Sequence, residues 1–142
     1  MKFIAAAAAV VMVAGSSAGT VSLLPEKVEV VMSAEAGATV KFAASEATNF
    51  LSRVLGAKVP LVGKPSSGAH VVSIVLGSNV WTRAAGIDTA ALKRDAFVTK
   101  VEAGRVYIAG RDDPKADLTW ALAGRTTVPF TERATLFGVY QF

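Results

Sequence analysis

Four acidic side chains toward the carboxyl end of the sequence are of the type that hydrolytic chemistry needs. Glycoside hydrolysis uses two carboxyl groups roughly 5 to 10 Å apart. The candidates are Asp112, Asp113, Asp117 and Glu132. Adjacent aspartates in a turn commonly accept hydrogen bonds from local backbone N–H groups, and a glutamate at a helix start interacts favourably with the helix dipole. These structural roles account for Asp112, Asp113 and Glu132, and we predict no catalytic residue in this chain.

The only histidine, His70, is the other side chain that a hydrolase or a metal site would need. The chain has no cysteine, and neither a second histidine nor a carboxylate stands at a recognisable metal-ligand spacing from His70. A Gly-x-Ser-x-Gly nucleophile motif is also missing. We therefore predict neither a metal site nor a cofactor. A free-standing hydrolase that uses His70 is kept as a minor alternative.

Aromatic side chains can offer flat faces to a sugar ring. Trp81 and Tyr107 fall on segments with regular hydrophobic periodicity, so we expect them in the core. Trp120 and Phe130 fall in the irregular segment 111–130, where we expect exposure. These two residues are the candidate glycan-binding residues, and a glycan-binding module that uses them is the alternative function.

Length and composition predict one globular domain. The chain has 142 residues, of which 52% are hydrophobic and 18% charged, so it is able to bury a core. The formal net charge is only +4, and no basic run is longer than two residues. This pattern argues against nucleic acid as a partner.

The amino-terminal segment has the pattern of a secretory signal peptide. Lys2 precedes an apolar run that is shorter than the roughly 20 residues of a membrane-spanning helix, and small residues follow at Ser16 and Ala18. We predict that residues 1–18 are removed and that residues 19–142 form the mature domain. The protein is then secreted or periplasmic in a bacterium, without membrane association after cleavage.

Periodicity predicts an α+β fold of the α/β sandwich type. Strands are expected at residues 27–33, 59–62, 70–77, 96–102 and 106–109, and helices at 38–55, at 78–85 and from 132 onward. This order implies a mixed sheet of four or five strands with two or three helices mainly on one face. Gly56 is the expected end of the first helix, and Ser78 and Thr131 are the expected N-caps of the other two.

The closing helix starts clearly but has no stop signal. Leu136, Phe137 and Tyr140 are expected to pack on the sheet, because their spacing puts them near one face. No glycine, asparagine or proline follows them as a terminator. We therefore expect an amino-terminal fragment of a longer multidomain protein, with Gln141 and Phe142 frayed at its end.

An ordered set of motifs carries a resemblance to a known family. The motifs lie at residues 43–62, 74–78, 85–88, 92–98, 104–110 and 132–142. With them, the chain resembles the amino-terminal, non-catalytic α/β domain that precedes the catalytic barrel in α-glucuronidases and β-hexosaminidases, as found in secreted bacterial glycan-degradation proteins. It departs from the family pattern in a longer segment 111–130 and in having Ala96 and Ala134 where glycine is expected.

The resemblance implies an accessory role and no catalysis. The fold would be like the β-hexosaminidase accessory domain, which is similar to zinc metalloproteases but without their metal site. The implied partner is a downstream catalytic domain of the same polypeptide. Phe137, Tyr140 and Phe142 are the candidate residues at the interface with that domain, and an oligosaccharide is the partner that the alternative function implies.

Overall fold

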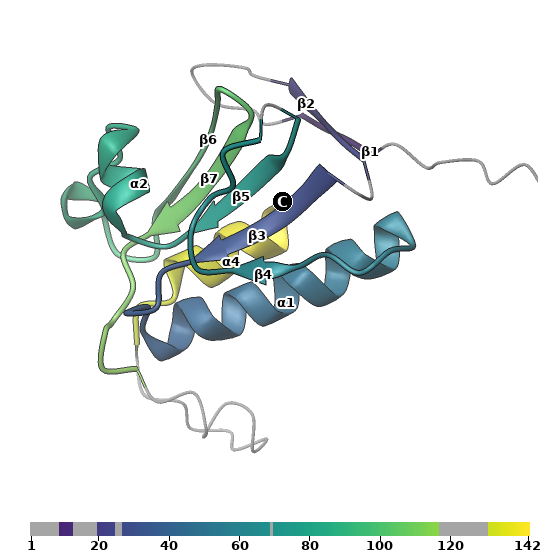
Figure 1. Ribbon diagram of the computed structural model, residues 1–142. Helices are drawn as coiled ribbons and strands as arrows, with labels where there is room; N and C mark the ends of the chain where they lie inside the picture. Colours follow the sequence, from purple (N-terminus) through teal and green to yellow (C-terminus); the bar gives the residue numbers. More distant parts are fainter. Residues whose placement is uncertain (1–8, 13–19, 25–26, 69, 117–130) are drawn as a thin grey trace, which may run out of the picture.

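The computed structural model describes residues 9–12, 20–24, 27–68, 70–116 and 131–142 (Figure 1). These residues form a mixed α+β fold. Its strands are β1 (Ala9–Met12), β2 (Thr20–Leu23), β3 (Val28–Met32), β4 (Leu61–Val62), β5 (Val72–Leu76), β6 (Phe97–Glu102) and β7 (Arg105–Gly110). Its helices are α1 (Ala38–Leu55), α2 (Val80–Ala84) and α4 (Ala134–Gln141), with a 3₁₀ turn at Thr89–Ala91. This architecture is consistent with an α/β sandwich.

The main sheet has five strands in the order β4-β3-β5-β7-β6. β4, β3, β5 and β7 run parallel to one another, and β6 runs antiparallel to β7. The prediction of a mixed sheet of four or five strands is therefore confirmed. β1 and β2 pair separately as an antiparallel ladder, and β1 lies within the segment that the sequence predicts to be removed.

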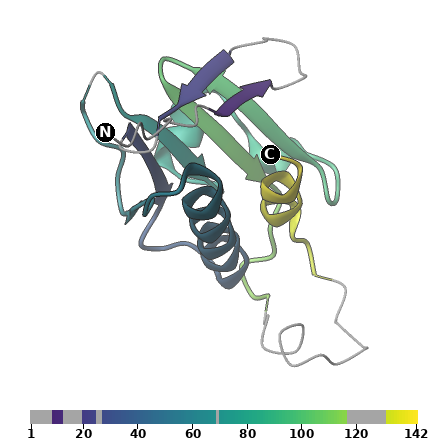
Figure 2. The same cartoon turned by 90° about the vertical axis from the view of Figure 1, so that its right-hand side faces the viewer.

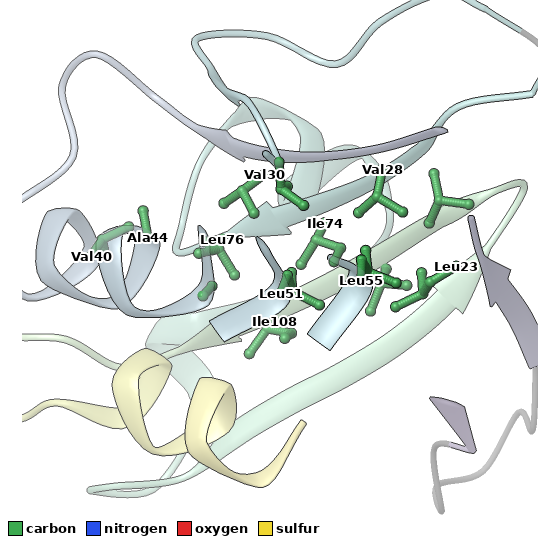
Figure 3. Packing of buried hydrophobic residues seen from close by; sticks show 14 residues of the cluster. Leu23, Val28, Val30, Val40, Ala44, Leu51, Leu55, Ile74, Leu76 and Ile108 are labelled. Carbon is green, nitrogen blue, oxygen red and sulfur yellow. The ribbon is translucent and has the colours of Figure 1, made fainter. Parts of the chain in front are cut away.

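One face of the sheet packs against α1 and α4, which lie side by side (Figures 1 and 2). Val30, Ile74 and Ile108 point toward the helices from three adjacent strands and are at most 1% exposed (Figure 3). Leu51 of α1 lies against this layer. Because each of these side chains is buried, truncating one of them leaves a cavity that costs several kcal/mol, about 2 to 5 for a large aliphatic residue.

The opposite face of the sheet carries a smaller apolar cluster. Val31, Val75 and Tyr107 form it, and Trp81 of α2 packs against them. Tyr107 is buried, as expected, and Trp81 is half-buried. Two of the three helices in the described residues thus share one face, which agrees with the predicted arrangement.

Local signals explain where several elements begin and end. α1 ends at Gly56, whose φ of +66° is the left-handed conformation that glycine adopts easily. The turn between β6 and β7 consists of Ala103 and Gly104, both with positive φ, as a two-residue type I′ hairpin requires. The N-cap of α2 is Asn79 rather than Ser78, because the Asn79 side chain accepts hydrogen bonds from the backbone N–H groups of Trp81 and Thr82.

Helix α4 departs from its prediction in its start and in its packing. It begins at Ala134, and Thr131 is not its N-cap. Gly138 lies against the sheet where a Cβ atom would come within 2.6 Å of Ile108 Cγ2 and 2.9 Å of Phe97 Cδ2. This close approach lets the helix backbone settle on the sheet. Leu136 is buried, as expected.

The expectation that Phe137 and Tyr140 pack on the sheet is wrong, because both are exposed. Gly138 occupies the sheet-facing position, so the flanking aromatic side chains turn outward. Phe142 is not frayed. Its backbone N–H donates to the Gly138 carbonyl oxygen at 3.1 Å, and its ring packs on the main core.

Candidate functional site

A cleft of about 610 Å³ opens where the parallel strands β3, β5 and β7 end. In sheets with parallel strands, ligands bind outside the carboxyl ends of the strands. Gly37 and Thr39 at the start of α1 line one side of the cleft, and Asp112 to Pro114 line another. The cleft is therefore the candidate functional site.

Glycines at the strand ends allow the walls of the cleft to approach closely. A Cβ atom on Gly77 would lie 2.8 Å from both methyl carbons of Val40 in α1. Gly77 also has a φ of +77°, which disfavours other residues. Gly110 contacts Ala134 so closely that a Cβ atom would overlap with it. Ala134 is fully buried there, and the absence of a side chain on Gly110 leaves room for its methyl group.

The first turn of α1 has no side chain that caps it. Its N-cap is Gly37, and no acidic residue lies in the first turn. The amide N–H groups there have no partner within the helix. Thr39 is only 1% exposed, and its Oγ1 has no hydrogen-bond partner within the part of the chain that the structure describes. Among the described residues, this end of the cleft thus has backbone donors without a side-chain cap and one buried hydroxyl without a partner.

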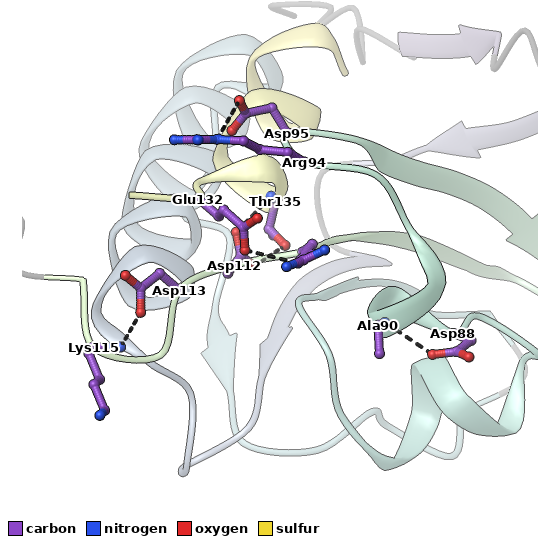
Figure 4. A network of polar contacts seen from close by, with 10 residues as sticks. Asp88, Ala90, Arg94, Asp95, Asp112, Asp113, Lys115, Glu132 and Thr135 are labelled. Carbon is purple, nitrogen blue, oxygen red and sulfur yellow. Dashed lines mark hydrogen bonds and ion pairs between the residues drawn. The ribbon is translucent and has the colours of Figure 1, made fainter. Parts of the chain in front are cut away.

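Asp112 stabilises the start of α4 from a distant position in the sequence (Figure 4). Its carboxylate accepts a hydrogen bond from the Thr135 backbone N–H at 3.0 Å and another from the Thr135 hydroxyl. The same hydroxyl accepts from the Gly110 backbone N–H at 3.0 Å. Asp112 therefore binds a backbone N–H group in the first turn of α4, which is the role that the sequence predicts for Thr131.

The pKa of Asp112 is raised, mainly by burial and also by the charge of Glu132. The two hydrogen bonds from Thr135 lower the pKa and oppose this effect in part. Asp112, Asp113 and Glu132 all line the cleft, so the structure brings three of the four acid candidates together. Each has a structural partner, because Glu132 Oε2 lies 3.0 Å from Arg111 Nε.

The other two acid candidates differ in what the structure shows of them. Asp113 lines the cleft, and its Oδ1 accepts from the Lys115 backbone N–H at 2.8 Å, as in an aspartate turn (Figure 4). Asp117 lies outside the described residues. The local backbone role that the sequence suggests for the aspartates is therefore confirmed for Asp113.

Glu29 is a buried carboxylate that sequence reasoning missed. It is 4% exposed and accepts hydrogen bonds from the Ser66 backbone N–H at 2.7 Å, the Ser66 hydroxyl at 2.6 Å and the Ser73 hydroxyl at 2.6 Å. Burial alone raises the pKa of Glu29, but these hydrogen bonds and the nearby Arg105 charge outweigh it and leave the pKa lowered. Glu29 thus fastens the loop after β4 to the sheet.

A second surface feature is an exposed apolar strip along α1 and α4, formed by Phe50, Val54, Phe137 and Tyr140. We call it the α1–α4 surface. Phe50 and Tyr140 are each 59% exposed, although they come from different helices. They line one shallow groove of about 200 Å³, together with Phe142. All three predicted interface residues therefore lie on or beside this surface.

The remaining candidates lie away from the cleft or beyond what the structure describes. His70 is exposed and precedes the amino end of β5, whereas the cleft lies at the carboxyl end of that strand. Trp120 and Phe130 lie outside the described residues, so their glycan-binding role stays a prediction.

Within the described ranges, no group of three His, Cys, Asp or Glu side chains has a metal-binding arrangement. None of the helices described there has the length and apolarity needed to cross a membrane. Comparison with known proteins finds no protein-family model that matches the chain and no curated protein with significant similarity to it.

Proposed function

We propose that this chain is a non-catalytic accessory domain of a secreted carbohydrate-active enzyme, with a fold like the β-hexosaminidase accessory domain. It scaffolds a catalytic domain that follows in the same polypeptide, and that domain docks on the α1–α4 surface. The observation that carries the proposal is the exposure of Phe50 and Tyr140 beside one groove.

Large apolar side chains gathered on one surface are characteristic of interaction sites. Aromatic residues are also enriched at the centres of protein interfaces. Phe50 and Val54 are one helical turn apart on α1, and Phe137 and Tyr140 are one turn apart on α4. Each pair therefore lies near one face of its own helix, and the groove brings Phe50 of α1 beside Tyr140 of α4.

The groove of the α1–α4 surface combines an apolar lining with a polar rim. The Phe142 side chain belongs to the lining. Glu46 at the rim lies 3.5 Å from the Tyr140 hydroxyl and gives the groove a polar border, as interfaces commonly have.

The partners of the cleft carboxylates support a role without catalysis. Asp112 bonds to Thr135, and Glu132 pairs with Arg111. These contacts give both acids a structural role in joining β7 to α4. In this proposal the acids that cut glycosidic bonds belong to the following domain.

The test replaces Phe50 and Tyr140 by lysine in the natural full-length gene product. The matched control is Val80→Lys, because Val80 is 60% exposed but belongs to α2, which packs on the other face of the sheet. We expect F50K/Y140K to separate the unfolding transitions of the two domains in calorimetry, and V80K to leave them coupled. Equal behaviour of the two variants would contradict the proposal.

Sedimentation of the 142-residue chain tests whether a second copy of the chain, rather than another domain, covers the α1–α4 surface. We expect a monomer, because the proposed partner is another domain. A dimer that F50K dissociates would mean that a second copy covers the surface, and the proposed role would then be wrong.

A further inference from the structure

We propose that the cleft at the carboxyl ends of β3, β5 and β7 binds an uncharged polyhydroxylated ligand, a sugar ring. This inference does not depend on the α1–α4 surface, which involves other residues. The cleft volume of about 610 Å³ falls within the range of small-molecule sites, roughly 300 to 1,000 Å³.

The amino end of α1 supplies hydrogen-bond donors to the cleft. Gly37, Thr39 and Val40 all line it, and the first-turn amides have no side-chain cap. The buried Thr39 hydroxyl has no partner among the described residues. Because buried polar groups in folded proteins are normally hydrogen-bonded, Thr39 marks the place where a ligand group completes the site.

The facing wall supplies acceptors. Asp113 uses one oxygen for the Lys115 backbone N–H, and a carboxylate has capacity for several hydrogen bonds. Ser78 is exposed at the rim, and its hydroxyl both donates and accepts. Val40 and Leu76 add apolar surface for the C–H groups of a ring. A ligand that fits this wall and the α1 amides must both donate and accept, as hydroxyl groups do.

Charge decides against an anion. Glu35, Asp112, Asp113 and Glu132 line the cleft, and Arg111, the one basic residue among the described residues that line it, is already paired with Glu132 at 3.0 Å. A carboxylate or phosphate ligand would therefore meet net repulsion despite the helix amides. The described residues also lack a metal-binding cluster. A neutral sugar ring is the class that uses the donors and the acceptors without a charge penalty.

The test titrates the full 142-residue chain with three molecules that share one ring and differ in charge: glucose, glucuronate and glucosamine. Amide chemical shifts of residues 37–41 and 111–113 report binding by nuclear magnetic resonance. We expect glucose to shift these signals in the millimolar range and glucuronate to bind at least about threefold more weakly, because the carboxylates repel it.

Three results would overturn the proposal. The first is an absence of shifts with glucose, galactose, mannose and N-acetylglucosamine alike, up to tens of millimolar. The second is tighter binding of glucuronate than of glucose. The third is binding of glucosamine alone, which would assign the cleft to a cation. None of these results bears on the docking role of α1 and α4.

Variants connect the binding to the assigned groups. Thr39→Val keeps the shape of the side chain and removes the hydroxyl, so we expect about three- to tenfold weaker glucose binding with unchanged or higher stability. Thr48→Val on the same helix is the matched control, since the Thr48 hydroxyl bonds to the Ala44 carbonyl oxygen at 2.7 Å and Thr48 does not line the cleft. Asp113→Asn removes one carboxylate charge from the cleft, so the affinities for glucuronate and glucose should become more similar. Unchanged glucose affinity in T39V would contradict the role of Thr39.

Discussion

Asp112 and Thr135 are joined by two hydrogen bonds, although 22 residues lie between them in the sequence. The Thr135 hydroxyl donates to the Asp112 carboxylate and accepts from the Gly110 backbone N–H. This pair fastens the start of α4 to the end of β7. It also forms part of the structure behind the cleft, because Gly110 and Asp112 both line it.

Replacing Thr135 by valine should destabilise the fold by about 2 to 3 kcal/mol. The change leaves the buried Gly110 N–H without its acceptor and removes one donor from Asp112. Chemical denaturation measures the loss, and Thr135→Ser should restore most of it. In a double-mutant cycle with Asp112→Ala, the two losses should be less than additive. Full additivity would mean that the pair does not act as a unit.

The cost of replacing Glu29 by glutamine should depend on pH. Because the folded pKa of Glu29 is lowered, its stabilising effect is present above the ordinary value of 4.5 and is lost as the pH falls through the folded pKa. We expect E29Q to cost about 1 to 3 kcal/mol at neutral pH and less in acid. Urea unfolding at several pH values measures this trend.

The stability cost of Asp112→Asn should depend on pH in the opposite direction. The folded pKa of Asp112 is raised, so its contribution is present below the ordinary value of 3.8 and is lost as the pH rises through the folded pKa. The cost of D112N should therefore be larger in acid than at neutral pH. The same trend for both variants would refute the assigned environments of the two acids.

Replacing Gly138 by alanine should destabilise the chain, although alanine favours helices by about 1 kcal/mol over glycine. The new methyl group would overlap with Ile108 and Phe97, so we expect a net loss of about 1 to 3 kcal/mol. Gly63→Ala is the control, because nothing lies within 4 Å of its added Cβ atom. Thermal unfolding compares the two variants. A stabilised G138A would mean that α4 does not approach the sheet this closely.

Export should remove the first eighteen residues and leave a chain that begins at Gly19. Leu23 of β2 is 1% exposed and belongs to the main core, so we expect this mature chain to keep β2 in place without β1. Its free energy of unfolding should stay within about 1 kcal/mol of that of the full chain. Amino-terminal sequencing of the exported protein checks the cleavage. An intact Met1 in the exported protein would show that the leader prediction is wrong.

Most of the architecture was predictable because it depends on local patterns. Residues 38–55 repeat apolar side chains at helical spacing and end at Gly56, and α1 has these bounds. The hairpin has glycine where positive φ is needed, and β5 is buried throughout and apolar except for Ser73, because both of its faces are covered. Long segments with strong hydrophobic periodicity can therefore be predicted without knowledge of their tertiary contacts.

The site was harder to predict because its contacts are distant in sequence. Glu29 looks like the polar residue of an alternating strand, and its partner Ser66 lies 37 residues away. The cap of α4 comes from Asp112, so no local cap signal marks it. In the sequence, Gly138 is only a residue of low helix propensity. Its close packing against Phe97 and Ile108 is visible only in the structure. In each case the deciding neighbour belongs to another element.

Hydrogen–deuterium exchange on the natural full-length gene product tests the docking role most directly. The comparison is between that protein and the isolated 142-residue chain, with attention to residues 46–54 and 137–142. If a catalytic domain covers the α1–α4 surface, these amides should exchange more slowly in the full-length protein, whereas those of α2 should not change. Equal exchange in both proteins, or a reading frame that stops after Phe142, would contradict the proposed role.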